Sequence, residues 1–417
     1  MSTETVPKGY KRTEVGVIPE EWEVKPVNEF GTIKTGPFGT LLKASEYTEH
    51  DGVPLISVGE VRNGFFRISD ETPRVSEQVT RRLPQYILKT GDIVFGRKGG
   101  VDRSAMVREN EYGWFLGSDG IAIRPSKELA HEYLGHQFQG STTKNWLLQN
   151  AIGSTMPSLN QEILGRVIIA IPPTVAEQQA IATALSDADA LIESLEQLLA
   201  KKRQIKQGAM QELLTGKRRL PGFEIFPGFK QTEIGAIPED WKLIAVGEVA
   251  KIGRGRVISH KEIAKSTSSM YPVYSSQTSN DGVMGYLDSF DFDGEYVTWT
   301  TDGANAGTVF YRSGKFNCTN VCGTIKLESD DPRFVSLALG IRTYGYVSRQ
   351  LGNPKLMNDV LKQVKVSMPP LPEQTAIAAV LSDMDAELEA LEAKLEKARQ
   401  VKQGMMQQLL TGKVRLV

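Results

Sequence analysis

The chain has 417 residues, a length that predicts two or three domains. Its 49 basic and 50 acidic side chains nearly balance, which excludes a polybasic coat but leaves room for a local basic groove. Two cysteines exclude a disulfide scaffold and indicate a reducing compartment. The longest apolar run, residues 167–171, is far shorter than the ~20 residues of a membrane span, and residues 1–14 lack the apolar core of a secretion signal, so we expect a cytoplasmic protein.

The first block, residues 1–172, opens with the motif TEVGVIPEEW at 13–22. Short alternating apolar runs at 91–95 and 120–123 predict strands, and the stretch near 131–150 predicts helix. The segment GRKGG at 96–100 follows the first of these strands, and a loop of this composition is suited to present side chains to a ligand. The block therefore reads as a mixed α+β domain.

The second block, residues 173–218, is predicted to be one long helix. Apolar or long side chains recur at 181, 185, 188, 192, 195, 199, 202, 206, 209 and 213. This spacing alternates four and three, which is the 3.5-residue period of a coiled-coil seam. Pro172 and Pro173 precede the helix, and Gly216 is placed to cap its end within Thr-Gly-Lys.

The second half of the chain repeats this plan. The motif TEIGAIPEDW at 232–241 repeats the first motif 219 positions later, and residues 373–416 repeat residues 177–220 at an offset of 196. Runs at 295–299 and 323–327 predict strands, and 332–350 predicts helix. We therefore expect a second mixed domain at 219–369 and a second long helix at 370–417.

The two long helices are expected to pack on each other. They have equal length, and each apolar stripe is too long for a globular core, which favours a mutual coiled coil. Lys202, Lys206 and Lys402 occupy seam positions, where we expect the helices to splay or the lysines to extend to solvent. The alternative is two separate helical hairpins, each packed on its own domain. The apolar seam is assigned to Ile181, Leu185, Leu195, Leu199, Ile377, Leu381, Leu388, Leu391 and Leu395.

The predicted fold class is thus α+β. Two mixed α/β domains are separated by two long antiparallel helices that form a coiled coil, with an internal pseudo-two-fold repeat.

Two variable globular blocks, each followed by a near-identical helix ending in QxLLTGK, resemble the specificity subunit of Type I restriction–modification enzymes over essentially the whole chain. The segment GDIVFGRKG at 91–99 is similar to the family's G-D-I-[LV]-x-x-R-x-G segment, and GSTMPSLN at 153–160 resembles its later G-S segment. The second half departs from the pattern, because Gly294 is followed by Thr301-Asp302-Gly303 rather than by Arg-x-Gly, and 352–358 is a variant of the later segment.

The resemblance implies a division of labour. Each globular block would be a target recognition domain that reads one half of a bipartite, asymmetric DNA site. The helices would set the distance between the halves and dock two adenine-N6 methyltransferase subunits, with motor-nuclease restriction subunits joining for cleavage. The chain itself would be non-catalytic, without cofactor or metal, and S-adenosylmethionine would be held by the methyltransferase. The rival interpretation is a coiled-coil scaffold that organises protein partners without reading DNA.

We expect the DNA contacts to be hydrogen-bonding side chains on Gly-rich or polar loops. Arg and Lys recognise guanine, while Asn and Gln recognise adenine. Most of them are expected to contact phosphate. In the first domain they are Lys34, Thr35, Lys43, Ser57, Arg62, Asn63, Arg97, Lys98, Arg103 and Ser104. In the second they are Arg254, Arg256, Ser275, Ser276, Gln277, Thr300, Thr301, Asn305, Asn353 and Lys355. Acidic and basic residues nearly balance in each block, so the basic surface must be local.

Catalytic motifs are incomplete wherever they begin. His131 and His136 are five residues apart, not the four of a zinc-protease helix. Cys318 and Cys322 have no second ligand pair at metal spacing, which favours two buried thiols. Thr215-Gly216-Lys217 lacks the upstream Gly and the following Ser or Thr of a P-loop.

Overall fold

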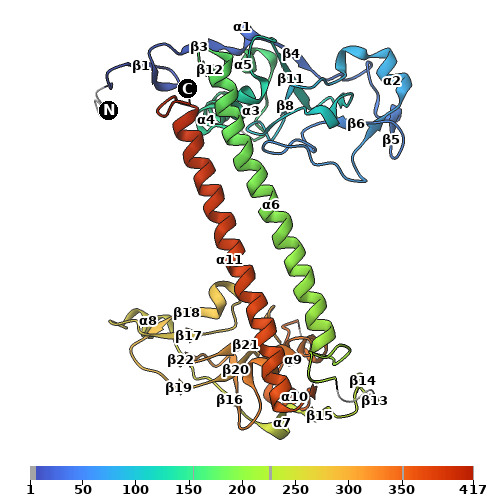
Figure 1. Ribbon diagram of the computed structural model, residues 1–417, viewed down its shortest axis with the longest axis vertical. Helices are drawn as coiled ribbons and strands as arrows, with labels where there is room; N and C mark the ends of the chain where they lie inside the picture. Colours follow the sequence, from blue (N-terminus) through green and yellow to red (C-terminus); the bar gives the residue numbers. More distant parts are fainter. Residues whose placement is uncertain (1–5, 154, 225–227, 350–351, 417) are drawn as a thin grey trace. The chain divides into compact units, whose positions relative to one another are not determined.

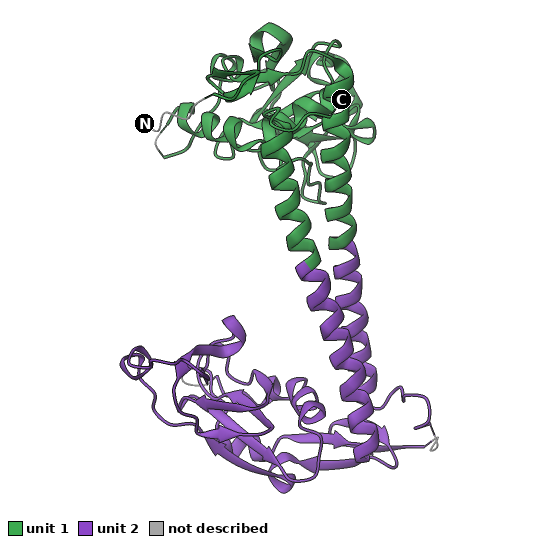
Figure 2. Cartoon of the chain, turned by 60° about the vertical axis from the view of Figure 1, so that its left-hand side comes forward, with its two compact units in different colours: residues 1–196, 394–417 green, residues 197–393 purple. Residues whose placement is uncertain are grey.

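The computed structural model describes residues 6–153, 155–224, 228–349 and 352–416. The chain divides into two compact units, coloured separately in Figure 2. Unit 1 consists of residues 1–196 and 394–417, and unit 2 of residues 197–393. Each unit therefore combines one globular part with a stretch of both long helices. The coarse prediction of mixed α/β architecture in two repeated parts with long helices is confirmed.

Unit 1 contains twelve strands among its described residues, arranged in the sheets β1-β2, β10-β6-β7-β5, β4-β11-β8-β9 and β12-β3. The strands are β1 (Tyr10–Thr13), β2 (Gly16–Pro19), β3 (Glu23–Pro26), β4 (Gly31–Thr35), β5 (Tyr47–Thr48), β6 (Val53–Ile56), β7 (Arg74–Val75), β8 (Ile93–Gly96), β9 (Ser104–Met106), β10 (Phe115–Leu116), β11 (Gly120–Pro125) and β12 (Ile168–Ile171). The short helices are α1 (Val27–Phe30), α2 (Glu77–Arg82), α3 (His131–Gln139), α4 (Ser141–Asn150) and α5 (Gln161–Gly165).

Unit 2 contains the sheets β13-β14, β15-β24, β16-β23-β20-β21 and β18-β17-β22-β19; the first three repeat the strand order of unit 1, and the last does not. Its strands are β13 (Phe229–Thr232), β14 (Gly235–Pro238), β15 (Lys242–Ala245), β16 (Ala250–Arg254), β17 (Tyr271–Tyr274), β18 (Val283–Leu287), β19 (Phe292–Asp293), β20 (Tyr296–Thr300), β21 (Val309–Arg312), β22 (Lys315–Cys318), β23 (Cys322–Leu327) and β24 (Lys365–Met368). Its short helices are α7 (Val246–Val249), α8 (His260–Ala264), α9 (Pro332–Gly340) and α10 (Asn358–Lys362).

Local chemistry explains where the predicted elements begin and end. The strand expected at 91–95 runs from Ile93, because Gly91 has φ +88° and the Asp92 carboxylate accepts the Lys89 N–H at 2.8 Å, which makes these two residues a turn. The helical stretch expected near 131–150 is two helices, because Gly140 is extended between α3 and α4.

The two longest elements are the helices α6 (Val175–Leu213) and α11 (Leu371–Leu409), each of 39 residues (Figure 1). All nine assigned apolar seam residues are buried or half-buried. Within unit 1, Lys402 pairs with Asp189 and Arg399 with Glu196 across the two helices.

Unit 2 contains the matching contacts between the same two helices. Lys206 pairs with Asp385, Arg203 with Glu392 and Lys202 with Glu387. In both units the helices are antiparallel, since Asp189 and Glu196 of α6 pair with residues 402 and 399 of α11, and Arg203 and Lys206 pair with residues 392 and 385. The sequence did not reveal that each seam lysine reaches a carboxylate on the other helix.

Each globular core is completed by both long helices. In unit 1, Trp22 packs in one buried cluster with Ile181 and Leu185 from the start of α6 and with Leu409 and Leu410 from the end of α11. In unit 2, the corresponding cluster joins Trp241, Ile377 and Leu381 with Leu213 and Leu214. Burial of these side chains ties the start of one helix and the end of the other to the same sheets.

The two repeated motifs pack on each other. Gly412 lies just after α11 with φ +68°, and a Cβ there would lie 2.5 Å from Cδ of Pro19 and 3.1 Å from the Trp22 ring. Gly216, with φ +69°, approaches Pro238 at the same distance in unit 2. Glycine is required at both positions by conformation and by space. This contact explains why I-P-x-x-W and T-G-K occur once in each half.

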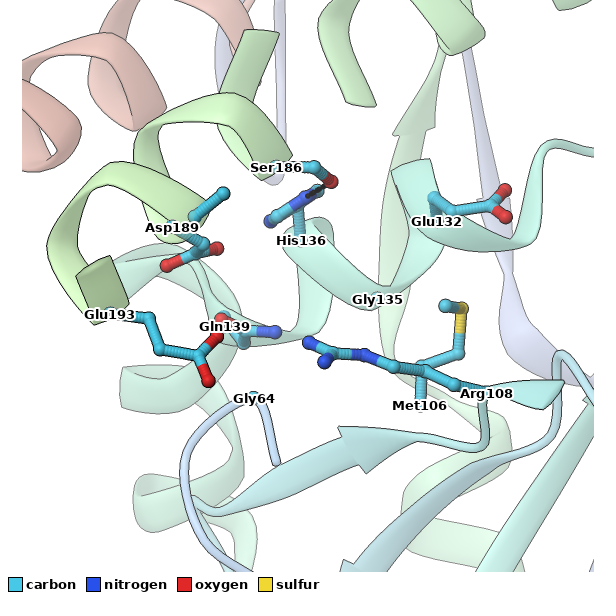
Figure 3. A pocket seen from close by; sticks show the side chains of 11 residues that line it. Gly64, Met106, Arg108, Glu132, Gly135, His136, Gln139, Ser186, Asp189 and Glu193 are labelled. Carbon is cyan, nitrogen blue, oxygen red and sulfur yellow. Dashed lines mark hydrogen bonds between the residues drawn. The ribbon is translucent and has the colours of Figure 1, made fainter. Parts of the chain in front are cut away.

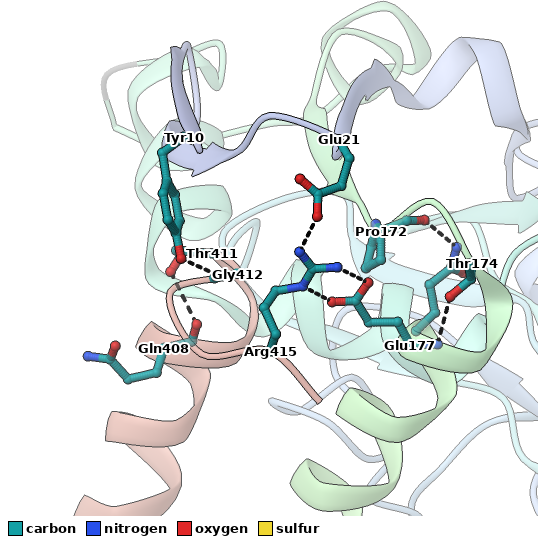
Figure 4. A network of polar contacts seen from close by, with 10 residues as sticks. Tyr10, Glu21, Pro172, Thr174, Glu177, Gln408, Thr411, Gly412 and Arg415 are labelled. Atoms are coloured by element: carbon teal, nitrogen blue, oxygen red, sulfur yellow. Dashed lines mark hydrogen bonds and ion pairs between the residues drawn. The ribbon is translucent and has the colours of Figure 1, made fainter. Parts of the chain in front are cut away.

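A buried ion network lies beside each of these contacts. In unit 1, the guanidinium of Arg415 binds both oxygens of Glu177 and one of Glu21 (Figure 4). In unit 2, Arg219 binds Glu373 at 2.6 and 2.7 Å and Asp240 at 2.9 Å. The Glu373 hydrogen bonds are the main cause that raises the pKa of Arg219. The network is more enclosed in unit 2, because the Arg219 side chain is 10% exposed and that of Arg415 is 26% exposed.

Candidate nucleic-acid interface

In unit 1, four strand ends meet at one edge of the sheet β4-β11-β8-β9. Ile121 of β11 pairs with Thr35 at the end of β4, and Gly120 pairs with Gly96 at the end of β8. Ser104, the first residue of β9, pairs with Phe95. The loops that follow β4 and β8 and precede β9 and β11 therefore leave the sheet on the same side. We name this side edge 1.

Backbone hydrogen bonds hold the loops of edge 1 together. The Gly36 N–H donates to Gly120 at 3.0 Å, and the Arg97 N–H donates to Asp119 at 2.8 Å. The Gly64 N–H donates to Ser104 at 2.8 Å. Nine of the ten predicted contacts in the first domain lie at or beside this edge: Lys34, Thr35, Ser57, Arg62, Asn63, Arg97, Lys98, Arg103 and Ser104. Lys43 lies further along the loop after β4, where its N–H binds Glu46 at 2.9 Å.

The side chains of edge 1 differ in how far they are already engaged. The Arg97 guanidinium lies 5.7 Å from the centroid of the Phe38 ring, and its buried Nε has no partner among the described residues. Lys98 pairs with Asp119 at 3.4 Å. Arg62 is folded onto its own loop, donating to the carbonyls of residues 59 and 61. Arg97 is thus held in place while its guanidinium keeps free donors.

Unit 2 has an equivalent edge in the sheet β16-β23-β20-β21, which we name edge 2. Arg254 at the end of β16 pairs with Gly323, and Thr300 at the end of β20 pairs with Cys322. The Thr301 N–H donates to Val321 at 3.0 Å. The loop carrying the later segment closes on this edge, since the Leu356 N–H donates to Thr301, and Lys355 forms a bridge with Asp302.

Several side chains of edge 2 are committed to protein partners. Arg256 donates to Glu262 at 2.7 Å and to Asp291 at 2.9 Å, and the Glu262 bond is the main cause that raises the pKa of Arg256. Thr300 and Thr301 are buried.

The other predicted contacts of the second domain lie near edge 2 with varied exposure. The Ser275 hydroxyl accepts a hydrogen bond from Thr319, and Gln277 donates to the Val283 carbonyl. Among the described residues, the Arg254 guanidinium donates a hydrogen bond to the Met357 sulfur alone, at 3.5 Å. Ser276 is half-buried, and Asn305 and Asn353 are exposed. Arg254, Asn305 and Asn353 are therefore the most available donors of edge 2.

Comparisons with known proteins identify the family of the whole chain. A family model described as the Type I restriction modification DNA specificity domain matches residues 19–206 and 238–399. The chain belongs to this family. Its members are the recognition components of type I systems rather than their catalytic ones, and the predicted family is confirmed.

The relatives support the same assignment with different coverage. The N-terminal part of a candidate type I specificity subunit from Mycoplasma pneumoniae is 43% identical over 142 residues, covering 34% of this chain and 75% of that protein. The type I restriction enzyme MpnII specificity subunit of the same organism is 41% identical over 138 residues, covering 33% of this chain and 41% of that protein. A candidate type I specificity subunit from Methanocaldococcus jannaschii is 26% identical over 98% of this chain and 97% of its own length. The aligned part is thus about two fifths of the MpnII subunit's length.

Two solved structures show the same fold. The crystal structure of a type I specificity subunit from M. genitalium has a TM-score of 0.63 at 14% identity, covering 93% of this chain and 96% of that one. A chain from a type I restriction–modification system has a TM-score of 0.53 at 14% identity, covering 95% and 99%.

Two residues of the globular parts were not among the predicted DNA contacts. Phe38 is 61% exposed at the tip of Gly36-Pro37-Phe38-Gly39, beside Arg97. An aromatic between two glycines in a turn was the available signal. Arg312, by contrast, is 4% exposed, stacks 3.7 Å from the Tyr274 ring centroid and pairs with Asp281, so it stabilises edge 2 from inside.

The two histidines of α3 lie in different environments. His131 contacts the Ser126 carbonyl at 3.2 Å, whereas His136 lies beside Ser186 and Asp189 of α6 (Figure 3). Burial lowers the pKa of His136 to about 4, with the charge of Lys402 adding to the effect. Its Nε2 is 3.1 Å from the Ser186 hydroxyl, and its Nδ1 has no partner among the described residues.

Among the described residues, the cysteines and the other candidate metal ligands do not come together in one site. Cys318 and Cys322 are buried free thiols with sulfurs 3.4 Å apart. The described residues contain no cluster of three or more metal-ligating side chains. No described helix is long and apolar enough to span a membrane.

Proposed function

We propose that this chain is the DNA sequence-specificity subunit of a type I complex and that it reads a bipartite, asymmetric site. The observation that carries this proposal is the pair of equivalent sheet edges with different side chains. Edge 1 presents Arg97, Lys98 and Arg103, whereas edge 2 presents Arg254, Asn305 and Asn353. Different donors at equivalent edges would recognise different bases, so the two half-sites would differ.

The chemistry of readout follows from these side chains. The Arg97 guanidinium, 5.7 Å from the centroid of the Phe38 ring, has the planar donor geometry that fits O6 and N7 of guanine. Asn305 and Asn353 of edge 2 carry the amide that pairs with N6 and N7 of adenine. Lys98 and Lys355 already have carboxylate neighbours and are better suited to phosphate contacts.

The long helices would form a coiled coil that sets the distance between half-sites. The assigned seam residues are buried or half-buried, and the antiparallel ion pairs occur within each unit. The exposed helix faces would dock two adenine-N6 methyltransferase subunits, and restriction subunits would join these. S-adenosylmethionine would be bound by the methyltransferase, which would also hold the flipped adenine.

The test is to map DNA modification. The chain is co-expressed with its methyltransferase partner in a host without DNA methylation, and N6-methyladenine is located by sequencing. The expected result is one motif with two short defined halves around a fixed gap. Exchange of residues 1–172 for those of another family member should change one half only.

A second variant tests the role of the helices. Insertion of one heptad into both α6 and α11 preserves the seam and adds ~10 Å, which corresponds to about three base pairs of gap. The matched control inserts the heptad into α6 alone, which breaks the register of the ion pairs. A soluble, methylation-active complex without a defined motif, or a motif unchanged by the domain exchange, would favour a protein scaffold instead.

A further inference from the structure

A basic groove lies next to edge 1 within unit 1. It has a volume of about 580 Å³, and its walls come from the loop at Asn63, the start of α4 and the last turns of α11. Four cations line it, Lys144, Arg399, Lys402 and Lys413, and no carboxylate is among its lining residues. The rest of the polar lining consists of amides and hydroxyls. These are the groups that proteins use to contact phosphate.

The groove is continuous with edge 1. The Gly64 N–H donates to Ser104, the first residue of β9, so the loop at 62–64 belongs to the edge. On its other side the same glycine approaches the Gln139 side chain, since a Cβ there would lie 3.0 Å from its oxygen. Gln139 and Asn63 both line the groove. A DNA strand leaving edge 1 would therefore pass directly onto this surface.

Two of the four cations are in no ion pair with a described carboxylate, although Asp102 lies near enough to act on the charge of Lys144. Arg399 pairs with Glu196, and Lys402 pairs with Asp189. Lys144 is half-buried and Lys413 is exposed, and neither is in an ion pair among the described residues. Burial is the main cause that lowers the pKa of Lys144; the charge of Asp102 opposes it, and the smaller effect of Lys402 adds to it. An anion bound beside Lys144 would offset the cost of holding its ammonium group half-buried.

We propose that this groove, through Lys144 and Lys413, binds the phosphate backbone of DNA that flanks the half-site read by edge 1. The inference rests on the proposed function and adds to it a surface that contributes affinity without reading bases. The repeat offset of 196 places Arg203, Lys206 and Lys217 of unit 2 at the positions of Arg399, Lys402 and Lys413, so three of the four cations recur in the second half of the chain.

The experiment measures salt dependence of binding. The full chain in complex with its methyltransferase is titrated against a duplex carrying the mapped site, between 50 and 300 mM salt. Each phosphate contact contributes about 0.9 to the slope of log K against log salt. Lys144→Gln and Lys413→Gln should each reduce the slope by about 0.9, and the double variant by about 1.8. At 150 mM salt each single change should weaken binding about fivefold, equally for specific and non-specific DNA.

Matched controls separate this effect from general loss of charge or fold. Lys127 is exposed beyond the end of β11 opposite to edge 1, where the Ser126 N–H donates to Phe30, so Lys127→Gln should leave the slope unchanged. Lys144→Arg keeps the charge and should retain the wild-type slope.

The outcomes are distinguishable. An unchanged slope in both glutamine variants, with site-specific binding intact, would overturn the groove proposal alone. Loss of base preference rather than uniform weakening would also overturn it. A wild-type complex that binds no site-specific DNA would remove the proposed function and the groove proposal together.

Discussion

The ion network of Arg219 gives a prediction about where the fold is most sensitive. Arg219 makes four charge-assisted hydrogen bonds, to Glu373 at 2.6 and 2.7 Å and to Asp240 at 2.9 Å twice. Glu373 is fully buried and keeps only the Trp241 Nε1 donor at 3.1 Å if the guanidinium is removed. Arg219→Met fills similar space but leaves this carboxylate uncompensated. The free energy of unfolding of unit 2 should fall by about 3–5 kcal/mol.

Comparison with unit 1 sets the scale. Arg415 occupies the equivalent place, but its side chain is 26% exposed and that of Glu21 is 52% exposed, so water can enter where the guanidinium was and solvate Glu21, although Glu177 itself is 2% exposed. Arg415→Met should therefore cost about 1–3 kcal/mol. The control is Arg218→Met, because Arg218 is 77% exposed and lies 3.9 Å from Glu212, a contact worth at most about 0.5 kcal/mol.

The assay must resolve the two units. Amide hydrogen exchange read by mass spectrometry reports the opening free energy of each unit separately, whereas one melting curve of a two-unit chain does not obey a two-state equation. For a unit of this size, the expected loss also corresponds to a fall of about 6–20 °C in its melting temperature. The reasoning is refuted if Arg219→Met destabilises unit 2 no more than Arg218→Met does, or if Arg415→Met is the more damaging change.

Three further predictions concern other parts of the chain. Gly412→Ala should destabilise unit 1 by about 1–3 kcal/mol through its left-handed φ and its contact with Pro19. Gly208→Ala lies within α6, where an added Cβ meets no neighbour, and should stabilise that helix by about 0.5–1 kcal/mol; amide hydrogen exchange measures both changes. The pKa of His136 is about 6.5 in the unfolded chain and about 4 in the folded one, so the unfolded state binds the proton first as pH falls. The free energy of unfolding of unit 1 should therefore fall by up to about 3 kcal/mol between these two pH values, and His136→Gln should flatten this dependence of stability on pH. Arg97→Ala should lower discrimination at one base of one half-site by about 1–3 kcal/mol in competition binding and leave the other half-site unaffected.

The architecture was largely readable from the sequence. The two long helices follow from the 3.5-residue period and their proline and glycine boundaries, and the structure places them at 175–213 and 371–409. The strands at 120–125 and 296–300 follow from runs of apolar residues bounded by glycine. The repeat itself shows that the second half copies the first. These signals are local, and local pattern determines secondary structure where burial agrees with it.

Which side chains of the candidate site are exposed and which are engaged by protein partners was less predictable. Loop composition identified Arg256 as a candidate donor, but Asp291, 35 residues further on, occupies its guanidinium. Thr300 and Thr301 belong to a polar run, and only the pairing of β20 with β23 shows that both are buried. The contact of Gly412 with Pro19 joins residues nearly 400 positions apart. Contacts of this kind depend on topology, which residue type and spacing do not encode.

Unit 1 is assembled from both ends of the chain, and this has a consequence during synthesis. Residues 1–196 leave the ribosome without Leu409, Leu410 and Arg415, which complete the cluster around Trp22. The 197 residues of unit 2 are made in between, and at 5–20 residues per second this takes about 10–40 s. During that interval unit 2 can close while the older unit stays open. A polypeptide cut short before residue 409 never closes its first-made part, and the apolar surface left there exposes it to cellular proteases.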